Sequence, residues 1–373
     1  MKYLLPLLCL LVLTGCWDQR LLKNARLIYA ASYDNAAQGK IHSSLIVRTI
    51  PASTGTGGQP PENDYAEAIG YTPRQTRQIM DSKLSGNLDA SKNRVVLIST
   101  SLAKKGIYPL LDVFYRDPQS SLGASLALVD GSADQILKMK KVGTVLIAEY
   151  ISHLIQSGQS NTYLPRDNLQ ELCPPLFDDG QDIAIPLLKE LPKQKDVIIK
   201  GVGLMNNRQY SGIDLNRKEA SMLLLLRGVK GDLARITEKV GHKSKATLNY
   251  ITIDVVKNKP HMNITFDAKG QPIIDMKLDL EVEAIEFPHD HLTSPTEIKK
   301  LNATLTAAFT KLAQRVIYKL QKANCDGLGI GRQLMAYHRS HYEKLGPWRK
   351  GVYQKIKIKT HVTTNVQDHG IIN

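Results

Sequence analysis

The sequence predicts a mixed α/β protein of two or three domains, and three observations lead to this prediction. The chain has 373 residues, which is more than a single domain commonly contains. In its first half, short apolar strands alternate with amphipathic helices, a pattern typical of mixed α/β sheets. In its second half, strands with alternating apolar and polar residues precede one long helix and a final strand.

The chain opens with a candidate targeting segment. Residues 4–20 read LLPLLCLLVLTGCWDQR, which is apolar up to Cys16 and then turns polar. Lys2 supplies a positive start, and the apolar run is too short to cross a hydrocarbon core of ~30 Å. The run ends in LTGC, which resembles a lipobox. We therefore expect residues 1–15 to be a cleaved signal peptide.

Cys16 would then be the first mature residue. A lipobox implies a diacylglyceryl group on its sulfur and an acyl chain on its amine, and two or more chains bind a membrane stably. The alternative is an ordinary signal peptide followed by an incidental cysteine.

The first half predicts elements in a regular order. Strands are expected at 25–34 and 40–50, and the Gly/Pro-rich stretch 51–64 predicts a mobile loop. Thr72, followed by proline, is typical of a helix start, and the helix is expected to end at Gly86. Further strands are expected at 93–100 and 123–131, and further helices at 106–117, 132–139 and 143–158.

The second half follows a polar stretch with a proline at 187–196, which we interpret as a linker. Alternation between 233 and 286 predicts antiparallel strands with turns at 257–260 and 268–272. Thereafter 296–322 carries apolar residues at steps of three and four, which is the longest helical signal in the chain. Its stripe includes Leu305 and Leu312, which we expect to lie in the core. The other elements expected are a strand at 197–207, a helix at 216–231, a glycine-rich break, a second helix, and a last strand at 353–366.

The expected organisation has three parts. It comprises the signal peptide 1–15, an N-terminal domain 16–192 and a C-terminal domain 193–373, the last with a strand-rich part at 197–287, a long helix at 296–322, and a terminal helix and strand at 327–366.

The chain is basic, with a formal net charge of +14. Such a balance suits an anionic partner, which could be a nucleic acid, a membrane surface or an acidic protein. The charges are spread along the chain without runs of five or six. They therefore indicate a general field rather than a binding motif, and we expect no nucleic-acid partner.

Two groups of residues could hold a metal ion. Glu281, Glu283, Glu286, His289 and His291 are close in sequence, and carboxylates with imidazoles can ligate metals. The glutamates, however, alternate as the solvent side of a strand would, and the histidines follow a proline in a turn. We therefore expect no metal there.

The second group, His338 and His341, lies one helical turn apart, and we expect these two histidines on an exposed helix face. Cys173 and Cys325 remain after the signal peptide and lie in no CxxC motif. We expect two free thiols, with a disulfide as the alternative for an exported protein.

No catalytic constellation stands out. The glycines of GLGIG (327–331) lack the dinucleotide-binding spacing and follow no strand, so they predict a break between helices that needs positive φ or close approach. GVGLMNN (201–207) also lacks the third glycine. There is no nucleophile elbow, zinc-protease motif or P-loop. Asn263 and Asn302 begin N-x-T sequons, which matter only in a cell that glycosylates. We expect no enzyme activity and no cofactor.

The ordered set of segments resembles the Ger(x)C family of lipoproteins, the C subunits of spore germination receptors. The most specific segment is LQKANCDGLGIGRQL (320–334), followed by Trp348 and a terminal strand. The other matching segments are CWDQR at Cys16, NRVVLISTSLAKKGIYPLLDVFYRDPQ (93–119), GVGLMNNRQYSG (201–212) and VYQKIKIKTHVTTNVQDHG (352–370). Two departures are STS (99–101), where the family usually has an acidic pair, and GIDL (212–215), where leucine usually follows the strand and turn that come after GVGL.

This resemblance implies a function. The chain would be a peripheral lipoprotein of a nutrient-sensing germinant receptor, held by lipid at Cys16 on the outer face of the inner spore membrane. Its partners would be a polytopic A subunit and an integral, transporter-like B subunit. The implied fold is about three packed domains, with mixed or antiparallel sheets surrounded by helices. The alternative is a lipid-anchored solute-binding protein or extracytoplasmic enzyme, for which a permease and an ATPase would be neighbouring genes.

Overall fold

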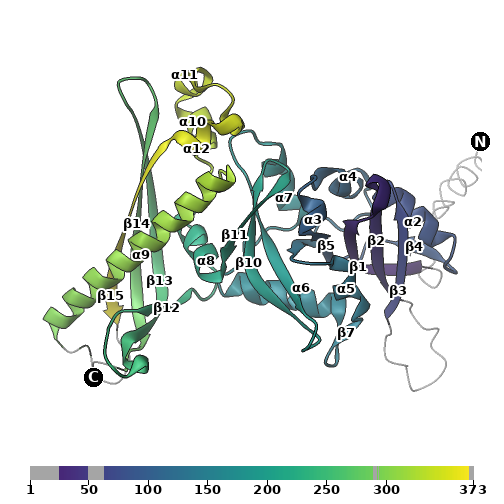
Figure 1. Cartoon of the computed structure of the whole chain (residues 1–373), viewed down its shortest axis with the longest axis horizontal. Coiled ribbons are helices and arrows are strands. Elements are labelled where there is room, and N and C mark those ends of the chain that lie inside the picture. Colours follow the sequence, from purple (N-terminus) through teal and green to yellow (C-terminus); the bar gives the residue numbers. More distant parts are fainter. Residues whose placement is uncertain (1–24, 49–62, 289–291, 293, 369–373) are drawn as a thin grey trace, which may run out of the picture.

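The computed structural model describes residues 25–48, 63–288, 292 and 294–368 (Figure 1). The expected signal peptide and Cys16 lie outside these residues, as does the predicted loop over 51–64 except for Asn63 and Asp64. Two large sheets dominate the described part. The first sheet fills the N-terminal end of the long axis, and the second lies with the longest helix at the other end (Figure 1).

The first sheet has nine strands and is mixed. Its order is β11-β10-β9-β6-β5-β1-β2-β3, and β4 pairs with β1 outside this path. The central strands β1, β5, β6 and β9 run parallel, and antiparallel strands extend both edges. The strands are β1 (Ala25–Asn35), β2 (Ile41–Arg48), β3 (Asn63–Gly70), β4 (Asn87–Asp89), β5 (Val95–Ser99), β6 (Ser125–Val129), β9 (Ala184–Leu191), β10 (Asp196–Asn206) and β11 (Gln209–Asn216).

Helices cover both faces of this sheet, because its central strands carry buried apolar residues on both faces. In β5, Val95 and Leu97 join one buried cluster, whereas Val96 and Ile98 join another on the opposite face. The first face packs against α5 (Ala133–Lys138), α6 (Ile147–Ser160) and α8 (Arg217–Leu226). The second packs against α2 (Pro73–Asp81), α3 (Thr100–Ala103), α4 (Tyr108–Arg116) and α7 (Leu169–Phe177).

The second sheet has four strands in the order β12-β13-β14-β15. They are β12 (Arg235–Lys239), β13 (Tyr250–Phe266), β14 (Pro272–Glu286) and β15 (Lys357–Asp368). The long helix α9 (Pro295–Ala323) connects β14 to β15, which run parallel, and covers one face. Burial alternates along β14, so one face packs on the helix while the other meets solvent.

Helix α9 also closes the outer edge of β15. The side chains of Asn302, Thr306 and Thr310 accept hydrogen bonds from the backbone N–H groups of Val366, Thr364 and Val362, at 2.9, 3.0 and 3.0 Å. An edge strand otherwise offers unpaired N–H groups to other chains. The polar row of α9 therefore protects this edge, and the sequon residue Asn302 has a structural role within it.

Small elements fill the connections. They are the strands β7 (Lys141–Val142) and β8 (Val145–Leu146), the short helices η2 (Ala37–Gly39), η3 (Ala246–Asn249), α10 (Ile330–Tyr337), α11 (Arg339–Tyr342), η4 (Glu343–Leu345) and α12 (Tyr353–Lys355), and the π-helical turn η5 (Trp348–Val352). Among the described residues, no helix is long and apolar enough to cross a bilayer.

The structure confirms the predicted fold class, with mixed sheets surrounded by helices, and confirms α9 together with its buried residues Leu305 and Leu312. The Thr72 cap of α2 is also confirmed, because its hydroxyl accepts a hydrogen bond from the Gln75 N–H at 3.1 Å. The helix ends earlier than predicted, at Asp81.

Two predictions were wrong. The stretch 187–196 is no linker, because its apolar residues complete β9 and its polar residues turn into β10 of the same sheet. The proposed domain division between residues 192 and 193 falls in that turn and stays a prediction. The turn predicted at 257–260 does not form, because β13 continues through these residues and stays paired with β14. The pairing shifts its register just before them, between Val255 and Lys257.

Candidate functional site

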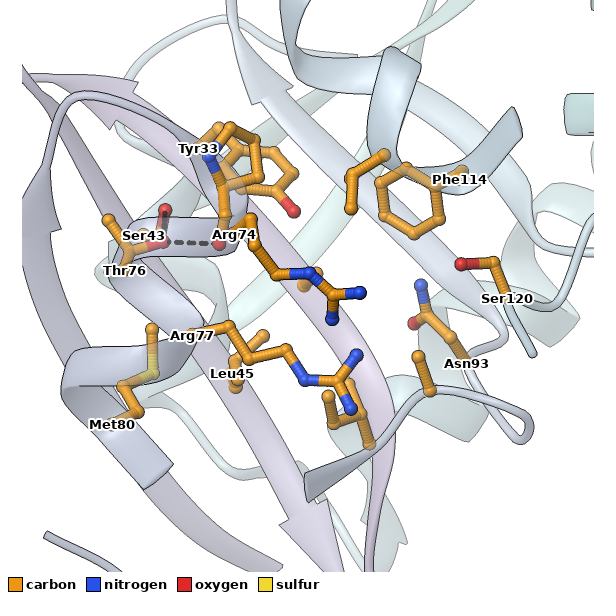
Figure 2. Close-up of a pocket in the computed structure, with 15 residues that line it drawn as sticks. Tyr33, Ser43, Leu45, Arg74, Thr76, Arg77, Met80, Asn93, Phe114 and Ser120 are labelled. Atoms are coloured by element: carbon orange, nitrogen blue, oxygen red, sulfur yellow. Dashed lines mark hydrogen bonds between the residues drawn. The ribbon is translucent and has the colours of Figure 1, made fainter. Parts of the chain in front are cut away.

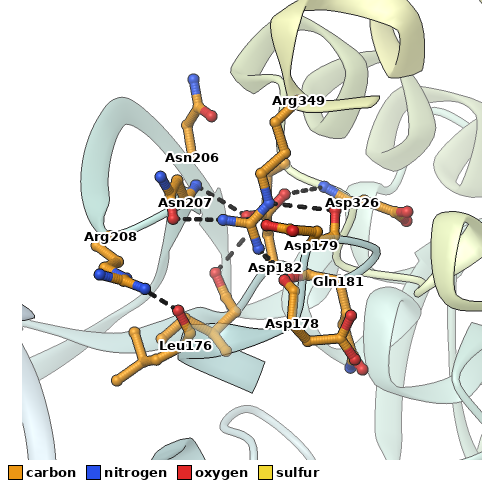
Figure 3. Close-up of polar contacts among 12 residues, drawn as sticks. Leu176, Asp178, Asp179, Gln181, Asp182, Asn206, Asn207, Arg208, Asp326 and Arg349 are labelled. Atoms are coloured by element: carbon orange, nitrogen blue, oxygen red, sulfur yellow. Dashed lines mark hydrogen bonds and ion pairs between the residues drawn. The ribbon is translucent and has the colours of Figure 1, made fainter. Parts of the chain in front are cut away.

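The glycine-rich segment after α9 forms a buried polar junction with the first sheet. We use the name carboxylate junction for Asp182, Asn207, Asp326, Trp348 and Arg349. Figure 3 labels four of them, all except Trp348. Asp326 is 1% exposed. Its carboxylate accepts hydrogen bonds from the Ile330 and Gly331 N–H groups at the start of α10, at 2.9 and 2.7 Å. It also accepts one from the Trp348 indole at 3.0 Å, so a single side chain caps a helix and holds an aromatic ring.

The glycines of 327–331 make this arrangement possible. Gly329 has φ of 71°, which only glycine adopts without strain. A Cβ on Gly331 would lie 2.5 Å from the Trp348 indole nitrogen. On the facing loop, a Cβ on Gly180 would lie 2.5 Å from the Arg332 backbone nitrogen. The predicted helix break with positive φ and close approach is thus confirmed.

Asp182 connects this segment to the loop after α7. Its backbone N–H donates to the Asp326 carbonyl at 3.0 Å, and its carboxylate accepts the Asp326 N–H at 2.9 Å. The other carboxylate oxygen accepts the N–H of Asn207, in the β10–β11 turn, at 2.8 Å. Three separate parts of the chain therefore meet at one carboxylate.

Arg349 closes the carboxylate junction from the C-terminal side. Its guanidinium donates to the backbone carbonyls of Asp178 and Gln181 and to the side chain of Asn207, and lies 3.5 Å from the Asp182 carboxylate (Figure 3). The planar donor fork of arginine suits such a multiple contact. The segment from Asp326 to Arg349 is therefore fixed onto the first sheet rather than hinged against it.

Burial sets the electrostatics of the carboxylate junction. It raises the pKa of Asp326 to about 7, against the opposing effect of its three donors. Burial also raises the pKa of Asp182, although the Arg349 charge acts in the other direction. The thiol of Cys325, beside them, has a pKa raised by burial and is therefore a poor nucleophile.

A pH dependence of stability follows from the raised pKa of Asp326. The folded protein holds the proton up to a higher pH than the unfolded chain does, so the stabilisation is complete below about pH 4 and is lost as the pH rises through about 7. We expect the melting temperature to fall over this window in the wild type and to fall less in Asp326→Asn. Thermal melts measure it, with Asp279→Asn, an exposed carboxylate, as the control. Equal slopes in all three proteins would contradict the assignment.

Sequence reasoning placed no role on Asp182, Asp326 or Arg349. The segment around Asp326 pointed only to a family resemblance and to a break between helices. The local pattern did not reveal Asp326 as a cap, because a capping side chain usually stands immediately before the first helical residue, and Gly329 stands there in α10. The contact of Asp182 with Asp326 had no signal either, since nothing local links residues so far apart in the chain.

Glu281, Glu283 and Glu286, which we considered as metal ligands, lie along β14. Glu281 lies 3.8 Å from the Lys259 ammonium, and Glu286 accepts a hydrogen bond from Thr252 at 3.3 Å. His289 and His291 lie outside the described residues. His338 and His341 pack against the ring of Phe266, with ring centroids 5.2 and 3.9 Å apart, so they cover the tip of the β13–β14 hairpin.

Another cluster of possible ligands lies between β2, β3 and α5. His42, Glu67 and Asp134 bring their ligand atoms within 4.8 Å of one another, the one such group among the residues described. The Lys138 ammonium lies 2.6 Å from Asp134 and 3.5 Å from Glu67, and already supplies a cation there. The sequence did not predict this cluster.

Cys173 and Cys325 do not form a disulfide with each other. Cys173 is half-buried in α7, Cys325 is fully buried next to the carboxylate junction, and both thiols are free, as predicted.

Family models match both halves of the chain. A model described as the spore germination protein N-terminal domain matches residues 18–190, and one described as spore germination B3/GerAC-like, C-terminal, matches residues 200–370. Together they cover nearly all of the sequence.

Curated relatives extend over the same length. The chain is 24% identical to spore germination protein GerQC of Bacillus cereus, over 99% of both chains. It is 22% identical to spore germination protein KC of Bacillus subtilis (strain 168), over 99% of this chain and 95% of that protein. The crystal structure of the GerBC protein shares its fold, with a TM-score of 0.53 at 15% identity over 94% of this chain and 99% of that one.

Proposed function

Because the chain belongs to the spore germination protein family of GerAC type, with a role in spore germination, we propose that it is the lipid-anchored C subunit of a nutrient germinant receptor. The observation that carries this proposal is the match to both family domains, in the right order, over nearly the whole chain. Relatives of the same length point to the same process.

The anchor in this proposal is Cys16. Signal cleavage after residue 15 would leave Cys16 at the mature N-terminus, and lipid on it would hold the chain at the outer face of the inner spore membrane. The positive net charge would add attraction to anionic headgroups within a Debye length of ~8 Å.

The proposed partners are the integral A and B subunits of the receptor, and the proposed action is through protein contacts, without catalysis or a cofactor. The fixed carboxylate junction supports this reading. A buried core cluster also continues from α6 and α8 through α9 into the second sheet. A hinged solute-binding protein would instead need two lobes that close on a cleft between them, so the alternative function receives no support from this arrangement.

Deletion of the gene tests the proposal. We expect spores without this chain to lose the response of its own receptor while other receptors still respond, because the complex lacks one subunit. Loss of optical density on germinant addition measures the response, and co-purification from detergent-solubilised spore membranes measures the contacts. Normal assembly and response of the A and B subunits in the deletion strain would refute the proposal.

A further inference from the structure

A small cavity opens between β1 and β2 of the first sheet and the helices α2 and α4 (Figure 2). Its volume is about 40 Å³, which is room for a few atoms the size of a water molecule. The apolar part of its wall comes from side chains such as Leu45, Met80 and Phe114. A wider hollow of about 410 Å³ shares Pro73, Arg74 and Val113 with the cavity. A ligand could therefore place one small group inside and the rest of its body in the hollow.

Asn93 is the unusual residue in this wall. It is 2% exposed, and neither its Oδ1 nor its Nδ2 has a hydrogen-bond partner among the described residues. Its amide points into the cavity (Figure 2). A buried amide without partners costs stability. Two other polar groups of the wall do have a partner, since Thr76 donates to Ser43 at 2.9 Å.

Two arginines give the cavity a positive charge. The guanidinium groups of Arg74 and Arg77 both point toward Asn93 (Figure 2). Arg74 forms an ion pair with Asp117 at 3.2 Å. Arg77 is half-buried and donates to the Leu88 carbonyl, and no carboxylate of the described part of the chain pairs with it. One uncompensated positive charge thus lies beside an unsatisfied amide.

We propose that this cavity binds the carboxylate of a small organic acid that carries a hydrogen-bond donor next to the carboxylate, such as a 2-hydroxy acid. The carboxylate would accept hydrogen bonds from Arg77 and from the amide of Asn93, and charge-assisted bonds of this kind are among the strong ones. The neighbouring donor would satisfy the amide oxygen.

Titration of the purified full-length chain with lactate and propionate tests this inference. These acids differ by the hydroxyl that Asn93 would recognise, and calorimetry at about pH 7 measures their affinities. We expect lactate to bind more tightly than propionate, and Arg77→Gln to weaken lactate binding about tenfold or more. Arg339→Gln, which removes an exposed arginine on α11, is the matched control and should bind as the wild type does.

The variant Asn93→Leu distinguishes a loss of ligand binding from a loss of folding. The substitution removes the unsatisfied amide at similar volume, so we expect a higher melting temperature by a few degrees together with loss of the preference for lactate. A chain that binds less while melting higher cannot owe the loss to misfolding.

Four results would overturn the inference. They are no heat of binding for lactate, equal binding to Arg77→Gln and to the control variant, equal affinity for lactate and propionate, and tighter binding of sulfate or of N-acetylglutamate amide. The last two probes stand for an inorganic oxyanion and for an acidic side chain of a protein partner. Because the measurement uses the isolated chain, its failure leaves the germination role untouched.

Discussion

A Leu305→Ala variant is expected to lose about 2–5 kcal/mol of unfolding free energy. Leu305 is 0% exposed and lies in the first half of the apolar stripe of α9, within the core cluster that extends over both sheets. Truncation removes buried apolar surface and leaves a cavity between α9 and the second sheet, because packed neighbours relax only partly. Because a whole domain is stable by only about 5–15 kcal/mol, this single change would visibly raise the unfolded fraction.

Denaturant unfolding of the purified chain measures this loss. The matched control is Tyr318→Ala, a large apolar side chain of the same helix that is 63% exposed, and we expect it to stay within about 0.5 kcal/mol of the wild type. If both variants unfold at the same denaturant concentration, the burial of the apolar stripe of α9 does not contribute to the stability of the protein as we predict.

A Cys16→Ala variant is expected to leave the membrane fraction and to abolish the germination response of its receptor. The reason is the proposed anchor, because two or more acyl chains bind a bilayer stably whereas charge attraction alone is weak and screened by salt. The effect should be close to complete rather than partial, since no other lipid site is proposed.

Fractionation of spore membranes before and after a high-salt wash measures this effect. Cys9→Ala is the control, because Cys9 lies in the same apolar run but would leave with the signal peptide. Its protein should stay in the membrane. A Cys16→Ala protein that remains membrane-bound after the salt wash would show that lipid on this residue is not the main anchor.

The elements that sequence could predict are those with a strong local signal. Thr72 before a proline starts α2, alternating burial marks β14, and the long stripe around Leu305 marks α9. In each case one element carries its own pattern, either a cap or a period of two or 3.6 residues.

The features that sequence could not predict depend on partners far along the chain. The residues of 187–196 look like a linker because their turn is polar, and only the neighbouring strands reveal a hairpin. Pro260 is typical of a turn, but here it lies in a strand opposite Leu278. The contacts of Asp182 with Asp326 and the buried amide of Asn93 exist only after the fold has brought distant segments together.

The parallel pairing of β15 with β14 has a consequence for folding kinetics. The hairpin of β13 and β14 closes through a short turn and can form within microseconds, but its open edge must wait for β15. In that pairing Ile273 meets Lys357, so closure spans a loop of about eighty residues that includes α9. Non-local pairing of this kind slows folding and leaves the strand edge exposed to other chains meanwhile. We therefore expect docking of the last strand to limit the refolding rate of the second sheet, and a chain that ends before β15 to aggregate through the bare edge of β14.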